Sequence, residues 1–299
     1  MLNEFLSAIS LGLLWTLMTF GVYFSYRILD IADLTAEGSL TMGAAIAAIC
    51  IVNGVNPFVA LLLALIGGML AGLVTGLLHT VLKIPALLSG ILTMIALWSI
   101  NLRIMGKANI PLLRVDTVFS IFSDLTGISK NYSVLIIGFL FVVAAGLIIY
   151  RFLGTEIGCA LRATGCNGGM ARAQGVNTDL MKILGLMIGN GLIALSGGLI
   201  AQSQAFADIQ MGTGAIVIGL ASLIIGEVLF GRSTVSKAMI AVVAGSVIYR
   251  LIIALVLKLG MPANDLKLFT AITVAICLWL PSIRSKLAQR SKKGGRNHA

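Results

Sequence analysis

The feature that most limits the fold of this 299-residue chain is a series of apolar runs, each long enough to cross a membrane. A helix of about 20 apolar residues spans the hydrocarbon core of a bilayer. The runs are apolar on every face and lack the period-two alternation of outer-membrane β-strands. With 59% hydrophobic and 11% charged residues, the chain has too little polar surface for a soluble domain. The sequence therefore predicts an all-α, polytopic membrane protein with about 8–10 transmembrane or half-membrane helices.

The apolar segments predict one transmembrane domain over residues 1–283, followed by a basic tail at 284–299. The first run is expected to be a span and not a cleaved leader. Two segments, 39–54 and 213–231, are short and rich in Gly and Ala, which favours half-helices, re-entrant segments or tilted spans. The predicted spans are 7–28, 39–54, 57–82, 84–104, 132–150, 183–206, 213–231, 234–258 and 266–282.

The basic residues orient these spans, because Lys and Arg accumulate in short cytoplasmic loops. Placing the tail inside and walking back along the chain puts 14 basic residues inside and 6 outside, with Arg250 within a span. The inside group includes Arg27, Lys83 and the loop at 151–182, and the outside group includes Arg103 and Lys130. We therefore expect a cytoplasmic C-terminus and, with nine spans, an external N-terminus.

Several other functions are disfavoured by the residue types. The basic tail is typical of a topology signal lying against anionic lipid, so we expect no nucleic-acid binding. The four cysteines match neither a disulfide framework nor a zinc site, and we expect no cofactor or metal. No catalytic constellation is apparent and no G-x-x-x-x-G-K-[ST] loop occurs, so the chain is not expected to be an enzyme. If its transport is ATP-driven, the motor is another polypeptide.

A weak internal echo predicts an inverted repeat. Ile31-Ala-Asp33 before one Gly- and Ala-rich helix is matched by Phe206-Ala-Asp208 before another, and a second pair of matching segments follows at nearly the same offset. An odd number of predicted spans separates the two copies, so the halves, approximately 20–104 and 183–282, would be inverted. In many transporters with this arrangement, broken helices at the repeat interface form the path.

Acidic residues at the two helix breaks have more than one interpretation, because a charge at membrane depth is costly and faces a partner or a watery cavity. Asp33 or Ser39 would cap a helix start. Asp33 could instead pair with Arg27, and Asp33, Glu37 and Asp208 could line the substrate path. Two further deep charges, Glu227 and Arg250, are each expected to be paired within the bundle.

Two other patterns predict packing and surface features. Gly68, Gly72 and Gly76 share one helix face and would let another helix approach closely, either within the chain or at a subunit interface. In the external loop, Val118–Phe122 predicts a short surface helix suited to contact with an external protein or to interfacial anchoring.

The long polar stretch within residues 151–182 is the main insertion between the apolar runs. Glu156–Arg162 is expected to form one or two helical turns that Gly165 breaks. Asn167 can cap a second short helix through Ala173, and Gly175 can end it. A short helix held between two transmembrane helices would act as a mechanical lever.

These motifs resemble the permease subunits of ATP-binding-cassette (ABC) importers, in the group that includes the branched-chain amino acid and ribose permeases. The resemblance rests on Gly158-x-x-Leu-Arg-Ala-x-Gly-x-Asn167, on Asp33-Leu-Thr-x-x-Gly-Ser39 and on Ile84-Pro85-Ala-Leu, and it covers most of residues 20–280. Within this group the chain most resembles a lipoprotein-linked branch for which aromatic amino acid uptake has been proposed. The extra acid, Glu37, departs from the sugar permeases and disfavours a sugar substrate.

The resemblance implies a bacterial plasma-membrane permease that works with an ATPase subunit, a second permease chain, most simply in a homodimer, and an extracellular solute-binding lipoprotein. The loop would dock on the ATPase through Glu156, Leu161, Arg162, Thr164, Asn167, Met170, Ala171, Arg172, Gln174 and Gly175. The pathway candidates are Tyr23, Tyr26, Asp33, Glu37, Gln202, Gln204 and Asp208. The alternative is an ion-coupled secondary transporter of small solutes, with Asp33 and Glu37 as ion or proton carriers.

Overall fold

The computed structural model describes residues 2–113, 115–231 and 234–258, together with 268, 271, 272 and 275. Seven helices in this part of the chain are long and apolar enough to span a membrane, and an eighth apolar helix is shorter. The predicted span at 266–282 and the basic tail lie outside the described residues. The helices are α1 (Leu2–Val22), η1 (Tyr23–Ile28), α2 (Thr35–Val52), α3 (Pro57–Thr80), α4 (Ala86–Met105), α5 (Val118–Thr126), α6 (Lys130–Leu153), α7 (Glu156–Cys166), α8 (Gly168–Ala173), α9 (Thr178–Gln204), α10 (Ala215–Phe230) and α11 (Val235–Lys258).

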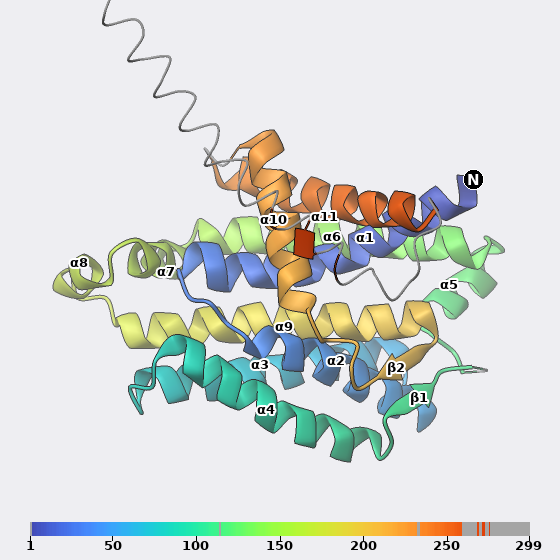
Figure 1. The fold of residues 1–299 in the computed structure, drawn as a ribbon, viewed down its shortest axis with the longest axis horizontal. Helices are drawn as coiled ribbons and strands as arrows, with labels where there is room; N and C mark the ends of the chain where they lie inside the picture. The colour runs from blue at the N-terminus through green and yellow to red at the C-terminus, as the bar shows by residue number, and fades with distance from the viewer. Residues whose placement is uncertain are drawn as a thin grey trace, which may run out of the picture.

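The long helices form two groups joined by α9 (Figure 1). On one side, α2, α3 and α4 pack together, and α2 and α3 also pack against α9. On the other side, α1 packs with α6, α10 and α11, and also contacts α9. Because α9 contacts both groups, 17 of its 27 residues are buried, and it is the central helix of the described bundle.

The two ends of the bundle carry different connections. At one end α7 and α8 project beyond the long helices, and at the other end lie α5 and an antiparallel ribbon of β1 (Asn109–Pro111) and β2 (Phe206–Asp208) (Figure 1). Lys83 lies at the α7–α8 end, where its Nζ is 3.7 Å from a carboxylate oxygen of Asp179. The grouping of Lys83 with the polar loop, and of Lys107 with the opposite end, matches the grouping inferred from the charges.

Several predicted helix boundaries differ from the structure by a few residues. The helix expected from residue 39 begins at Thr35, whose N–H donates to the buried Asp33 carboxylate, and the helix expected from residue 183 begins at Thr178. The short segment expected at 213–231 is α10, whose 16 residues cross the long helices at a steep angle (Figure 1). The short helix expected at Val118–Phe122 forms as α5, with a capping box between Thr117 and Ser120, and its first residues, Val118 and Phe119, are buried.

Candidate solute cavity and coupling loop

A buried hydrogen-bond network fixes the start of α2 inside the bundle. One carboxylate oxygen of Asp33 accepts a hydrogen bond from the Thr35 N–H at 3.0 Å, and the other accepts one from Asn190 Nδ2 at 2.7 Å. Ser39 does not cap the helix; its hydroxyl donates to Asn190 Oδ1 at 2.7 Å. Asp33 is 2% exposed, so the network positions the broken helix and leaves Asp33 closed off from the surface.

The expected ion pair between Asp33 and Arg27 is wrong. Arg27 lies in η1, a π-helical turn that continues α1. It forms a bidentate ion pair with the carboxylate of Glu227 near the end of α10. The Nε atom of Arg27 is 2.7 Å from Glu227 Oε1. The partner of Glu227 is thus 200 residues away in sequence, and the ion pair ties η1 to α10.

The other deep charge, Arg250, stacks on an aromatic ring. Its guanidinium carbon lies 4.2 Å from the centre of the Trp15 ring, which is close enough for a cation–π interaction. Its Nε atom is buried without a hydrogen-bond partner in the described part of the chain. Arg250 is therefore held against the face of the Trp15 ring.

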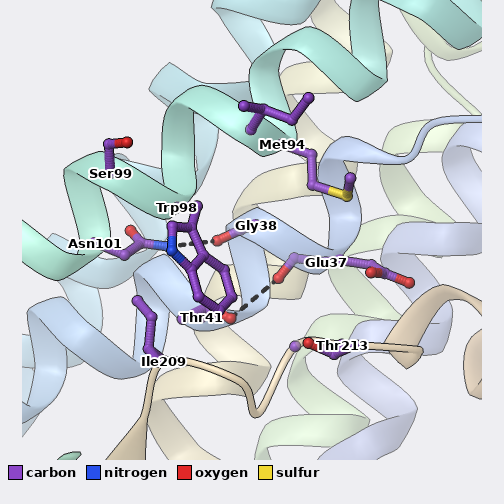
Figure 2. Close-up of a pocket in the computed structure, with 11 residues that line it drawn as sticks. Glu37, Gly38, Thr41, Met94, Trp98, Ser99, Asn101, Ile209 and Thr213 are labelled. Carbon is purple, nitrogen blue, oxygen red and sulfur yellow. Dashed lines mark hydrogen bonds between the residues drawn. The ribbon is translucent and has the colours of Figure 1, made fainter. Parts of the chain in front are cut away.

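A cavity of about 350 Å³ lies between α2, α4 and the connection from β2 to α10 (Figure 2). Its polar lining comes chiefly from Glu37 and Thr41 of α2, Asn101 of α4, and Thr213. Its apolar lining comes from Met94, Ile95, Trp98 and Ile209. A mostly apolar cavity with a few convergent polar groups is the usual form of a small-molecule site.

Glu37 is the acidic group of this cavity. Its Oε1 accepts a hydrogen bond from the Gly214 N–H at 3.0 Å, which holds the carboxylate beside the β2–α10 connection. Within the described residues Glu37 takes part in no ion pair. An acid at membrane depth without a basic partner is a candidate for contact with a solute or an ion.

Sequence reasoning missed two asparagines that complete these sites. Asn190 supports Asp33, and Asn101, which lines the cavity, donates from Nδ2 to the Gly38 carbonyl at 3.1 Å while its Oδ1 is buried without a partner among the described residues. Both are 1% exposed. The signal was available, since each is a polar residue inside an apolar span, where such residues are costly and usually functional.

The remaining pathway candidates are not brought together around Glu37. Asp208 lies in the β-ribbon, where it accepts hydrogen bonds from Asn109 Nδ2 and from the Gln210 N–H. Gln202 is buried and accepts a hydrogen bond from the Val118 N–H at 2.9 Å. Gln204 lines a separate polar cavity of about 380 Å³ between α1, α6 and α9. Tyr23 is buried and Tyr26 half-buried in η1, at the other end of α1.

The polar loop folds as two short helices with side-chain caps at three turns. The Thr155 hydroxyl accepts from the Gly158 N–H to start α7, Asn167 accepts from the Met170 N–H to start α8, and Asn177 accepts from the Leu180 N–H to start α9. Gly175 has a φ of +86°, a conformation that favours glycine, and it ends α8. Local side-chain caps therefore mark where the helices of this loop begin.

Gly165 does not break α7, contrary to expectation. The helix continues through Cys166, and Gly165 instead lies against the end of η1, where a Cβ atom would collide with the Ile28 carbonyl oxygen. The glycine is thus needed for close approach and not for a turn. It places the projecting loop directly on the π-helical turn that carries Arg27.

The predicted docking residues divide into a buried and an exposed group. Leu161, Thr164 and Ala171 are buried and hold the loop to the rest of the chain. The exposed group contains Glu156, Arg162, Asn167, Met170, Arg172, Gln174 and Gly175. Met170 is 63% exposed although its side chain is apolar, and such a side chain at the tip of a loop suits a contact with another surface.

The glycine face of α3 is directed at α9. A Cβ atom on Gly68 would meet the Asn190 carbonyl, one on Gly72 would meet the Leu186 carbonyl, and one on Gly76 would lie 3.0 Å from the Ile183 Cα. These glycines allow α3 to approach the central helix within the chain. The close contact also holds the backbone that presents Asn190 to Asp33.

A bundle of spanning helices, with a broken helix beside a cavity and a two-helix loop at one end, defines a multi-pass membrane permease. The chain belongs to the family of permease components of branched-chain amino acid transport systems, because the model of that family matches residues 5–278. Its members are permease subunits of ABC transporters, which confirms the resemblance seen in the loop and at the helix break.

Two similar proteins cover nearly the whole chain. A tyrosine transport system permease protein of Clostridioides difficile is 43% identical over 98% of this chain and 96% of its own length. An uncharacterised protein of Rickettsia prowazekii is 36% identical over 93% of this chain and 97% of its own length.

Solved structures share the fold. A metal-chelate-type ABC transporter in an inward-facing conformation gives a TM-score of 0.53 at 15% identity, over 95% of this chain and 85% of that one. The PsaBC complex of Streptococcus pneumoniae with a Fab gives a TM-score of 0.52 at 15% identity, over 92% and 90%. At this identity the likeness concerns the fold alone.

Proposed function

We propose that the chain is the membrane-spanning subunit of an ATP-driven importer in the bacterial plasma membrane, coupled to a separate ATPase through α7 and α8. The observation that carries the proposal is the projecting loop, which is exposed at Met170 and anchored through Gly165 on η1. Movement of this loop by the ATPase would be transmitted to the transmembrane helices through η1, at the end of α1. The chain would enclose the path together with a second copy of itself.

The proposed solute is an amino acid, and within that class an aromatic one, delivered by an extracellular binding lipoprotein. The family match supports an amino acid, and the name of the Clostridioides difficile relative supports tyrosine. The cavity beside Glu37 supports the same class, since it combines one acid with apolar walls. Asp33, Tyr23, Tyr26, Gln202, Gln204 and Asp208 remain proposed parts of the path or its framework.

The test of coupling is a double substitution at the exposed tip, Met170→Ala with Arg172→Ala, in the chain co-purified with its ATPase. Side chains that anchor an interface typically contribute more than about 1 kcal/mol each, so the pair should weaken assembly ~10-fold or more. Solute-stimulated ATP hydrolysis should fall with it. Lys107→Ala at the opposite end is the control and should change neither quantity. Coupling through this loop is wrong if assembly and stimulated hydrolysis survive replacement of all its exposed side chains.

An ion-coupled secondary transporter is the second candidate, and the acid without an ion pair at Glu37 is the observation that favours it. The two mechanisms differ in their energy source. In proteoliposomes that contain the chain and its ATPase, uptake by an importer requires ATP on the side of the membrane where α7 and α8 lie. Uptake driven by a proton or sodium gradient in the absence of the ATPase would establish the secondary transporter instead.

A further inference from the structure

The cavity between α2 and α4 has two chemical features that together describe a ligand. These are the carboxylate of Glu37 and the partly exposed ring of Trp98 (Figure 2). They come from two helices and lie around one cavity of about 350 Å³, within the usual size range of small-molecule sites.

Glu37 is oriented for a cation. Its Oε1 is occupied by the Gly214 N–H, and its Oε2 accepts no hydrogen bond from the described residues. The side chain is half-buried, so water solvates it only in part. A carboxylate held in this way gains most from a charged donor such as a primary ammonium group.

The second feature is an apolar wall formed by Trp98 and its neighbours on α4. Trp98 is 45% exposed and Ile95 is 59% exposed, although both line the cavity. An indole face provides stacking area for an aromatic ring. The described lining contains no Lys, Arg or His, so it provides no cation for a carboxylate.

We propose that this cavity is a solute-binding site for aromatic primary amines, in which Glu37 binds the ammonium group and Trp98 stacks on the ring. The inference rests on the proposed function and goes further, because it assigns recognition of the amine and the ring to this chain. This site is not expected to bind the α-carboxylate of an amino acid. Tyramine, which lacks the carboxylate, should therefore bind at least as well as tyrosine.

The experiment measures direct binding to the purified importer, the chain with its ATPase in lipid nanodiscs, using tritiated tyramine. Unlabelled tyrosine and tyramine should compete, whereas 3-(4-hydroxyphenyl)propionate, which lacks the amine, should not. Glu37→Gln should weaken tyramine binding ~10-fold or more, the change expected when a charge-assisted hydrogen bond of about 1.5–3 kcal/mol is lost. Asp124→Asn on α5 is the matched control, since it removes an exposed acid far from the cavity.

Trp98 provides a second test if Glu37→Gln does not elute as a single assembled species. Trp98→Ala should weaken tyramine binding, and Trp98→Phe should restore part of it because a ring is retained. The site is refuted if 3-(4-hydroxyphenyl)propionate competes as well as tyramine, if the Glu37 and Trp98 variants bind as wild type does, or if wild type binds no tyramine.

A separate measurement distinguishes failure of this site from failure of the proposed function. ATP-driven uptake of tyrosine is followed in proteoliposomes with the binding protein supplied outside. If wild type takes up tyrosine and Glu37→Gln takes it up equally well, the proposed importer function stands and the proposed site is refuted. Absence of ATP-driven uptake of any amino acid by wild type refutes the proposed function itself.

Discussion

Gly72 occupies a position with no space for a methyl group. A Cβ atom there would lie 2.8 Å from the Met187 Cα and nearer still to the Leu186 carbonyl, and backbone atoms of a central helix cannot rotate away. Gly72→Ala should therefore push α3 from α9 and destabilise the chain by about 1–3 kcal/mol, the usual cost of overpacking. Thermal unfolding of the detergent-purified chain, followed by tryptophan fluorescence, measures the change.

Gly146 is the matched control for that substitution. It also lies within a spanning helix, α6, but the nearest atom to an added Cβ is the tip of the Phe20 ring at 3.8 Å, an ordinary contact distance. Gly146→Ala should leave the unfolding temperature unchanged or raise it slightly, because Ala is the better helix former. A Gly72→Ala chain as stable as the Gly146→Ala chain and the wild type would show that α3 and α9 are not in the close contact described.

At the scale of elements, η1 joins three parts of the protein. It continues α1, receives Gly165 of α7, and holds α10 through Arg27 and Glu227. A π-helical turn is uncommon and frequently marks a functional site. Movement of the loop would therefore be transmitted to α10 through this turn.

The ion pair can be tested with a charge swap. Arg27→Glu and Glu227→Arg should each destabilise the chain, because each places like charges together in a partly buried site. The double variant should recover part of the loss, since contacting residues couple by about 0.5–3 kcal/mol in a double-mutant cycle. Unfolding temperature and tyrosine-stimulated ATP hydrolysis are measured together. Strict additivity of the two single effects would mean that η1 and α10 are not linked through this pair.

Local signals in the sequence predicted the elements well, and long-range partners could not be predicted. Asn167 and Gly175 mark the ends of α8 through bonds within a few residues, so their roles follow from spacing alone. Arg27 and Asn190, in contrast, find partners 200 and 157 residues away, and only the packing of helices decides which side chains meet. The same reason explains Gly165, whose neighbour Ile28 is distant in sequence.

Of the candidate site, the sequence predicted the acid and not the cavity. Glu37 is recognisable in the sequence as an extra charge at a helix break. Trp98 lies in an apolar span, where one more aromatic residue does not indicate a binding site. Asn101 is recognisable as a polar residue in an apolar span, but only the structure shows that its partner is the Gly38 carbonyl. The inverted repeat stays a prediction: Asp33 supports a buried helix start, while Asp208 lies in a ribbon, so the two equivalent acids have different surroundings.

At the scale of the whole molecule, the alternating helices place α5 at one end and α7–α8 at the other. The charge assignment from the sequence puts 14 basic residues inside, those of the loop at 151–182 among them, against 6 outside, and it predicts that the α7–α8 end is cytoplasmic. Cys159 in α7 and Thr126 in α5 are both exposed, which makes them suitable reporters of sidedness.

Two single-thiol chains test the orientation, one retaining Cys159 and one carrying Thr126→Cys, with all other cysteines replaced by alanine. In spheroplasts that lack the ATPase, a membrane-impermeant maleimide should label position 126 directly. It should label Cys159 only after the membrane is permeabilised. Because an ATPase can dock only on the cytoplasmic face, labelling of Cys159 in intact spheroplasts would reverse the topology and remove α7 and α8 as the coupling element.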